Sequence, residues 1–207
     1  MTRSLANGGT LRYADRSDLA EETEPMHMAH TTGGLTLEEL HRLPDDGNKY
    51  ELVHGELFVT PPPSVSHEEL ASLLARILDK YAAAAGLGRV YRPRAVLRAL
   101  DSEVEPDLMV RAPTGRNADW ADAPLPILVV EILSDSTRRR DYVLKRDFYL
   151  EAGVPEYWIV DGEQRMIRVV RSGHADVLVA ESLAWHPAGA GDPLIIDVPT
   201  FFHEALG

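Results

Sequence analysis

Two carboxylates and one lysine are the residues of this sequence best placed to do chemistry, and Glu131 is the first of them. It interrupts the apolar run Ile127–Leu133. In a β-strand it would share a face with Val129 and Leu133, in a part of the sheet with little water. An ionised carboxylate in such a place is costly unless it is compensated. We therefore expect a cation, a metal ion or a hydrogen-bond network to face Glu131.

Asp107 is the second carboxylate, and it directly follows Pro106. Proline cannot donate to a β-ladder, so this strand is expected at a sheet edge, at a bulge or at its own start. Carboxylates from neighbouring strands can converge on a hard divalent cation such as Mg²⁺, which keeps several waters. Alone, Asp107 would equally well accept hydrogen bonds from turn amides.

Lys145 lies on a predicted helix spanning residues 141–152. Steps of about 100° per residue place it on one stripe with Asp141 and with three apolar residues, Leu144, Phe148 and Ala152. Lys145 should therefore point toward the sheet and meet Glu131. In an enzyme it would orient an attacking water or stabilise charge on a phosphate. A buried structural pair with Glu131, or an ordinary helical ion pair with Asp141, explains it equally well.

The surrounding pattern indicates a mixed α/β fold, with one sheet flanked by helices. Capping-box spacings at Thr36–Glu39 and Ser66–Glu69 each predict a helix start. The first helix is short and ends near Pro44, and the second spans 66–85. His54-Gly55 is expected to form a tight hairpin turn. The expected strands are 50–53, 56–60, 90–100, 104–110, 127–133, 157–160, 166–171, 177–180 and 194–198, and a short helix closes the chain.

Composition limits the class of protein. The 207 residues predict a flexible tail over 1–34 and one domain over 35–207. The net charge of −12 argues against a protein that coats nucleic acid by bulk electrostatics. With no cysteine, a metal must be held by oxygen or imidazole ligands. The sequence shows no spanning apolar segment and no signal peptide, so we expect a cytoplasmic protein.

The order of these groups resembles the signature of the PD-(D/E)XK nuclease superfamily, and more closely the Uma-type restriction endonuclease family. The resemblance covers roughly residues 35 to 205. It is carried by Tyr50–Glu56, Ser66-His67, Glu105–Asp107, Val130–Ser136, Asp141 with Lys145, and Gly153–Asp161. It implies a restriction-endonuclease-like core, a central mixed sheet flanked by helices, in a metal-dependent enzyme that hydrolyses nucleic-acid phosphodiesters.

The resemblance also implies roles for single residues. Asp107 and Glu131 would bind the metal, Mg²⁺ or Mn²⁺, and Lys145 would assist the water. The superfamily pattern places lysine at position 133, where this chain has Leu133, and the displaced Lys145 is the candidate in its place. Glu56 and His67 are secondary catalytic candidates by the same resemblance, although surface solubility and helix capping explain them as simply.

Other residues are weaker candidates. Glu51 is a carboxylate of the same kind as Glu56, and Asp141 would position Lys145. Two basic groups could hold DNA phosphates or could equally be solvated: Arg138–Arg140 with Lys145 and Arg146, and Arg89, Arg92, Arg94 and Arg98, whose even-numbered members would share a strand face.

Three functions follow as hypotheses. The first is a Mg²⁺- or Mn²⁺-dependent endonuclease whose substrate is DNA. The second is a noncatalytic module that keeps the fold to bind nucleic acid or protein, and the third is a hydrolase of a small phosphoester. A homodimer is expected because Val143 and Leu150 lie opposite the inward stripe of their helix and because the C-terminal strands offer edges.

Overall fold

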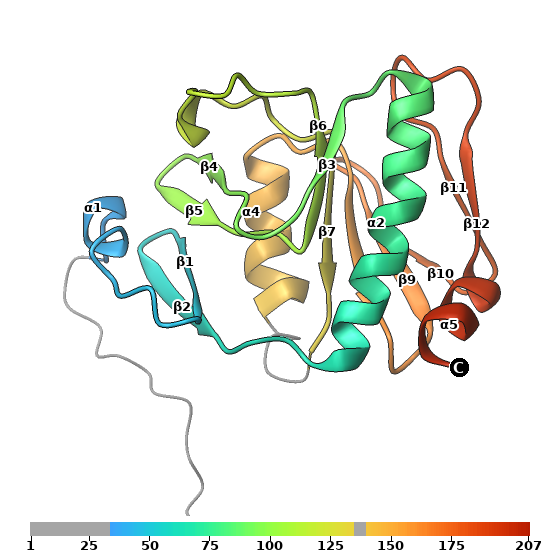
Figure 1. Ribbon diagram of the computed structural model, residues 1–207, viewed down its shortest axis with the longest axis horizontal. Coiled ribbons are helices and arrows are strands. Elements are labelled where there is room, and N and C mark those ends of the chain that lie inside the picture. The colour runs from blue at the N-terminus through green and yellow to red at the C-terminus, as the bar shows by residue number, and fades with distance from the viewer. Residues whose placement is uncertain (1–33, 135–139) are drawn as a thin grey trace, which may run out of the picture. The chain divides into compact units, whose positions relative to one another are not determined.

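The computed structural model describes residues 34–134 and 140–207 (Figure 1). These residues all belong to one compact unit, Thr32–Gly207. Apart from Gly34, the tail expected over residues 1–34 lies outside the described residues.

The strands of the described residues form three sheets. The largest has six strands in the order β10-β9-β8-β7-β6-β3, the second has the order β2-β1-β5-β4, and β11 pairs with β12. The strands are β1 (Lys49–Val53), β2 (Glu56–Thr60), β3 (Arg89–Tyr91), β4 (Leu97–Ala99), β5 (Ser102–Val104), β6 (Leu108–Arg111), β7 (Leu128–Ile132), β8 (Tyr157–Asp161), β9 (Met166–Val170), β10 (Val177–Val179), β11 (Ser182–Trp185) and β12 (Leu194–Asp197).

Helices cover both faces of the six-stranded sheet. The helices of the described residues are α1 (Leu37–Leu40), which packs against β1 of the second sheet, α2 (Val65–Ala85), α4 (Arg146–Glu151) and α5 (Val198–Leu206), with a 3₁₀ turn η1 (Trp120–Asp122) and a π-helical turn η2 (Asp141–Lys145). In the six-stranded sheet β7 and β8 run parallel, and the other strand pairs are antiparallel. A parallel pair needs a crossover connection, and η2 with α4 belongs to it. The expected mixed sheet flanked by helices is confirmed.

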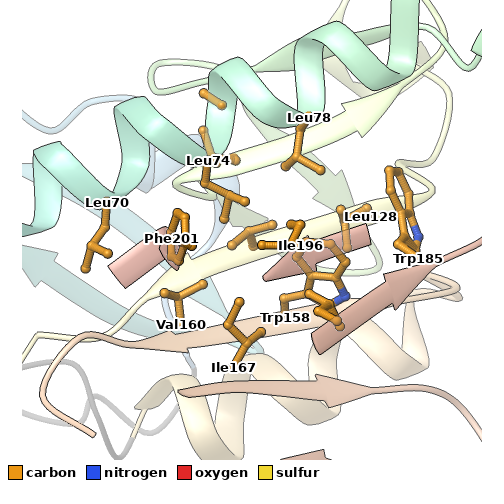
Figure 2. Close-up of a cluster of buried hydrophobic side chains, with 14 of the residues drawn as sticks. Leu70, Leu74, Leu78, Leu128, Trp158, Val160, Ile167, Trp185, Ile196 and Phe201 are labelled. Atoms are coloured by element: carbon orange, nitrogen blue, oxygen red, sulfur yellow. The ribbon is translucent and has the colours of Figure 1, made fainter. Parts of the chain in front are cut away.

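The apolar run of β7 is explained by its two covered faces. Leu128, Val130 and Ile132 belong to the core under α2, whereas Val129 belongs to the core on the other face, with Phe148 of α4. Figure 1 shows α2 and α4 on opposite sides of β7. Leu70, Leu74 and Leu78 project from α2 toward Leu128, Trp158 and Val160 (Figure 2). Because strand residues alternate between faces, Glu131 lies on the α4 side, as predicted.

The predicted strand 104–110 is wrong in one informative respect. The chain leaves the second sheet after Val104 and enters the large sheet at Leu108, so Glu105-Pro106-Asp107 is a crossover between sheets. Pro106 suits this segment because it has no N–H to pair. Asp107 accordingly stands at the start of β6, one of the positions expected for it.

Two further boundaries differ from the expectation. The helix predicted from Ser66 begins at Val65, because the hydroxyl of Ser64 accepts the backbone N–H of His67. The predicted strand 90–100 is interrupted by a turn, so it forms the separate strands β3 and β4. The Thr36–Glu39 capping box and the His54-Gly55 hairpin are confirmed, and both turn residues have the positive φ of a tight hairpin.

The predicted helical stripe over 141–152 is also corrected. Its first turn is π-helical, and the wider turn changes the angle between successive side chains. Leu144 is therefore exposed, whereas Asp141, Lys145, Phe148 and Tyr149 are buried. The inward direction of Lys145 is confirmed. Strand β11 was not predicted from the sequence; it pairs with β12 and contributes to the core under α2.

Candidate active site

A cleft of about 510 Å³ opens where the hairpin β1–β2, the start of α2 and the end of β7 meet. Asp107, Glu131 and His67 all contribute to its wall. The other lining residues are Gly47, Lys49, Thr60–Ser64, Glu68, Ala71, Ser72, Arg92–Arg94, Glu105, Leu108, Ile132, Ser134, Arg140 and Asp141. The structure thus brings together, in one cavity, side chains predicted from segments far apart in the sequence.

Asp107 is held in one orientation at the floor of the cleft. Its Oδ2 accepts the backbone N–H of Ile132 at 2.8 Å and the Nε2–H of His67 at 3.0 Å. Lys49 Nζ lies 3.5 Å from the other oxygen, Oδ1. Burial by itself would raise the pKa of Asp107, but Lys49 and His67 outweigh it and hold that pKa well below its usual range. Asp107 is therefore ionised and oriented.

Glu131 is almost fully buried, and the side chains that donate hydrogen bonds to it do not line the cleft. Its Oε1 accepts Lys145 Nζ at 2.8 Å and the hydroxyl of Tyr149 at 2.6 Å. Burial raises the pKa of Glu131 to about 7, an effect to which Asp107 adds and which Lys145 opposes. The raised pKa means that the surroundings stabilise the ionised form of Glu131 only weakly. A further positive charge beside Glu131 would stabilise that form.

Lys145 is fully buried and lies behind Glu131 rather than on the cleft wall. Its Nζ donates to Glu51 Oε1 at 2.8 Å as well as to Glu131. Burial of Glu51 is outweighed by Lys145, Lys49 and Arg140, which lower the pKa of Glu51 to about 2. Asp141 Oδ1 lies 3.9 Å from Lys145 Nζ, within the range of the predicted helical ion pair. Glu51, predicted only as a weak candidate, is therefore the anion that shares Lys145.

Residues 37–189 match Uma2, described as "Putative restriction endonuclease". The chain belongs to the Uma2 family. A crystal structure described as a putative nuclease of DUF820 from Anabaena variabilis is similar, with a TM-score of 0.71 and 20% identity over 83% of this chain and 99% of that chain. No curated protein matches. The fold of this Uma2 chain is thus similar to that of the Anabaena variabilis protein, and the family resemblance named from the sequence is confirmed.

Of two cations at the Uma2 site, Lys49 was not recognised from the sequence and Arg140 was predicted without its individual contacts. Lys49 shares a strand face with Glu51, two residues on, and this spacing was the available signal. Arg140 was predicted only as part of a basic run. Its Nη1 donates to Thr60 Oγ1 at 2.9 Å and its guanidinium lies 5.3 Å from the Phe58 ring. Both cations line the cleft.

Of the two secondary catalytic candidates, His67 lines the cleft and Glu56 does not. His67 is in the cleft and bonded to Asp107, where burial would lower its pKa but Asp107 raises it. Glu56 is opposite Val53 at the turn end of the hairpin, whereas Lys49 and Thr60 pair at the end that reaches the cleft. The structure therefore does not bring Glu56 to the other candidate residues.

The predicted basic groups are only partly at the cleft. Arg92, Arg94 and Arg140 line it, and Arg138 and Arg139 lie outside the described residues. Arg98 is engaged elsewhere, by Glu103 and Asp119, and Arg146 by Asp176. The expectation that Arg92, Arg94 and Arg98 share a strand face is wrong, because only Arg98 is in a strand.

Proposed function

We propose that this Uma2 chain is a Mg²⁺- or Mn²⁺-dependent endodeoxyribonuclease, in which Asp107 and Glu131 hold the metal. One observation carries the proposal: two carboxylates from the ends of the paired strands β6 and β7 line a single cleft. Family membership and the nuclease fold support the same activity.

The residues present fit such a metal. Both candidate ligands are carboxylates, the hard oxygen donors that Mg²⁺ prefers. Within residues 34–134 and 140–207 no group of three or more acidic, histidine or cysteine side chains is arranged to hold an ion. Mg²⁺ is usually bound through one or two carboxylates, with waters and substrate phosphates completing its shell. A pair of carboxylates beside an open cavity is therefore sufficient.

The chain's own residues would fix the two ligands and place the substrate. His67 and the N–H of Ile132 orient Asp107, while Lys145 and Tyr149 orient Glu131. Lys145, predicted to assist the water, would act through Glu131 and is a positioning residue. When bound, the metal would supply Lewis-acid activation of water and stabilise charge on the phosphate.

DNA is the proposed substrate because the cleft carries cations at its wall. Arg92 and Arg94 are exposed there, and Arg140 lines the same cleft. Guanidinium groups bind phosphate oxygens well and orient a nucleic-acid backbone without reading its sequence. Local positive charge of this kind is compatible with a chain of net charge −12.

A plasmid-nicking assay tests the function. Wild-type protein should nick DNA when Mg²⁺ or Mn²⁺ is added, and Asp107→Asn or Glu131→Gln should lower the rate at least about 100-fold. Glu56→Gln, the same carboxylate-to-amide change away from the cleft, should retain the wild-type rate. Equal rates in all four proteins would contradict the assignment of the site.

The same assay separates the alternatives. Metal binding without cleavage of DNA would favour a noncatalytic module. Cleavage of RNA or of a small phosphodiester in place of DNA would reassign the substrate while leaving the metal site intact. Ca²⁺, which binds oxygen ligands at longer distances than Mg²⁺, is expected to bind without supporting turnover.

We also propose that the chain forms a homodimer. Val177 and Leu178 are exposed on β10, the edge strand of the large sheet, and Val143 is exposed on η2, whereas Leu150 packs partly against the core. An open, apolar sheet edge favours pairing with a second chain. Sedimentation velocity should show a dimer, and a monomer at high concentration would contradict it.

A further inference from the structure

Two lysines are close to the proposed metal ligands, and they differ in what they can reach. Lys145 has no solvent exposure, and both of its carboxylate partners, Glu51 and Glu131, are themselves buried. Movement of Lys145 toward a substrate would strip two buried carboxylates of their cation, at considerable cost. A ligand in the cleft therefore does not meet Lys145.

Lys49 is placed differently. It lines the cleft, and its side chain retains 16% of its exposure. Its Nζ donates to the carbonyl oxygen of Glu105 at 3.0 Å and to Asp107 Oδ1 at 3.5 Å, and lies 3.9 Å from Glu51 Oε1. An ammonium has three N–H donors, so one is left for an oxygen atom of a ligand that enters beside Asp107.

Lys49 also places a positive charge beside two carboxylates, Glu51 and Asp107. Burial would lower its pKa, but the charges of Glu51 and Asp107 outweigh burial and raise that pKa above its usual value. A fixed positive charge beside the metal ligands is suited to stabilising charge that develops on a phosphate.

We propose that Lys49 is the residue that contacts the substrate phosphate. When no substrate is bound, its ammonium group competes with the metal ion for Asp107. This assignment rests on the proposed nuclease function. It makes Lys49 a catalytic residue, in the role that the sequence predicted for Lys145.

The two roles of Lys49 give effects of opposite sign in one variant. Lys49→Met removes a positive charge beside Asp107 and Glu51, so a divalent cation should bind more tightly, by about fivefold or more. The same change removes the phosphate contact, so cleavage at saturating metal should fall by about 10²- to 10³-fold. A residue that only supported the fold would weaken both properties.

The experiment compares four proteins: wild type, Lys49→Met, Lys49→Arg and the control Lys80→Met. Lys80 is exposed on α2 and does not line the cleft, so its variant makes the same chemical change at a distance. Mn²⁺ affinity is measured by calorimetric titration without DNA. Affinity for a short fluorescent DNA duplex is measured in Ca²⁺, and the cleavage rate in saturating Mg²⁺.

The proposal predicts tighter Mn²⁺ binding, at least tenfold weaker DNA binding in Ca²⁺ and the loss of cleavage in Lys49→Met. Lys49→Arg, which keeps the charge, should recover cleavage to within about tenfold of wild type. Lys80→Met should behave as wild type in all three measurements. Weaker Mn²⁺ binding in Lys49→Met, or DNA binding equal to that of Lys80→Met, would overturn the proposal.

Failure of the nuclease function would look different. A wild-type protein that binds Mn²⁺ and DNA but cleaves no DNA contradicts the proposed activity. The two binding measurements would still decide whether Lys49 competes with the cation and contacts phosphate.

Discussion

At the scale of single residues, Glu131 is supported from one side and open to the cleft on the other. Lys145 and Tyr149 donate to the same oxygen, Oε1, from the α4 side. Lys145 also neutralises Glu51, so one buried ammonium serves two buried carboxylates. Such an arrangement is expensive to break by removing one member, because the other charges remain buried.

Removal of the Lys145 charge should therefore destabilise the fold as well as the site. We expect Lys145→Met to lower the free energy of unfolding by about 3–5 kcal/mol, measured by urea denaturation at neutral pH. The double variant Glu51→Gln with Lys145→Met removes one of the stranded carboxylates and should regain part of that loss. If the single variant Lys145→Met were as stable as wild type, Lys145 would not be the residue that neutralises the buried carboxylates Glu51 and Glu131.

At the scale of the elements, α4 with η2 is the unit that brings Lys145 and Tyr149 to β7. The position of α4 is fixed by packing of Phe148 and by an ion pair with the segment before β10. Arg146 binds both oxygens of Asp176, at 2.8 and 3.2 Å, and Arg168 of β9 lies 3.3 Å from Asp176 Oδ2. Asp176 thereby joins the helix to the edge of the sheet.

This junction should be sensitive to acid. The hydrogen bonds from Arg146 and its charge lower the pKa of Asp176 below the ordinary value. Stabilisation by Asp176 is therefore complete above the pKa of the unfolded chain, and it is lost as the pH falls through the lower pKa of the folded state. Asp176→Asn should be less stable than wild type by about 0.5–1 kcal/mol near neutral pH, and the two should converge in acid.

Asp147→Asn is the matched control for that measurement. Asp147 also contacts Arg146, at 3.1 Å, but its side chain is 69% exposed. Its replacement should change the pH dependence of chemical denaturation much less. Parallel stability curves for wild type and Asp176→Asn between neutral and acid pH would contradict the role given to Asp176.

The elements also show which parts of the site could be predicted from the sequence. The apolar run around Glu131 was informative because a strand that is buried on both faces needs apolar residues at successive positions. Such a run therefore predicts a central strand. The crossover at Glu105–Asp107 was not predictable, because the exchange of sheets depends on strand pairing far away in the chain. Lys49 was missed since a charge at the start of a strand usually faces solvent, and only the fold brings it to Asp107.

The helical segment gave a mixed result for a local reason. Ideal α-helical spacing predicted the inward direction of Lys145 correctly, but it also predicted a buried Leu144, which is exposed. The first turn of this segment is π-helical, and its wider spacing of side chains is not contained in a 3.6-residue periodicity. No described helix is long and apolar enough to cross a membrane.

At the scale of the whole molecule, a strongly acidic chain places four basic side chains around one cleft, beside the carboxylates of that cleft, Glu68, Glu105, Asp107, Glu131 and Asp141. The chain carries 33 acidic and 21 basic residues, a net charge of −12. Lys49, Arg92, Arg94 and Arg140 nevertheless gather around one cavity. Binding of DNA should therefore depend on a few local contacts, and long-range attraction should contribute little.

The salt dependence of DNA binding measures these contacts. With about three or four phosphates neutralised, the slope of log K against log salt concentration should be about −3 in the presence of Ca²⁺. Replacing both Arg92 and Arg94 by Met should make that slope shallower by about 2, for any DNA sequence. An unchanged slope in a fluorescence-anisotropy titration would place the DNA elsewhere on the surface.

The proposed function requires Asp107 and Glu131 to share one cation in the cleft. Crystals soaked in Mn²⁺ and measured at the manganese absorption edge test this directly. We expect an anomalous peak at about 2.0–2.3 Å from a carboxylate oxygen of each residue. A saturating soak that leaves the cleft without a peak, or a peak that contacts neither carboxylate, would contradict it.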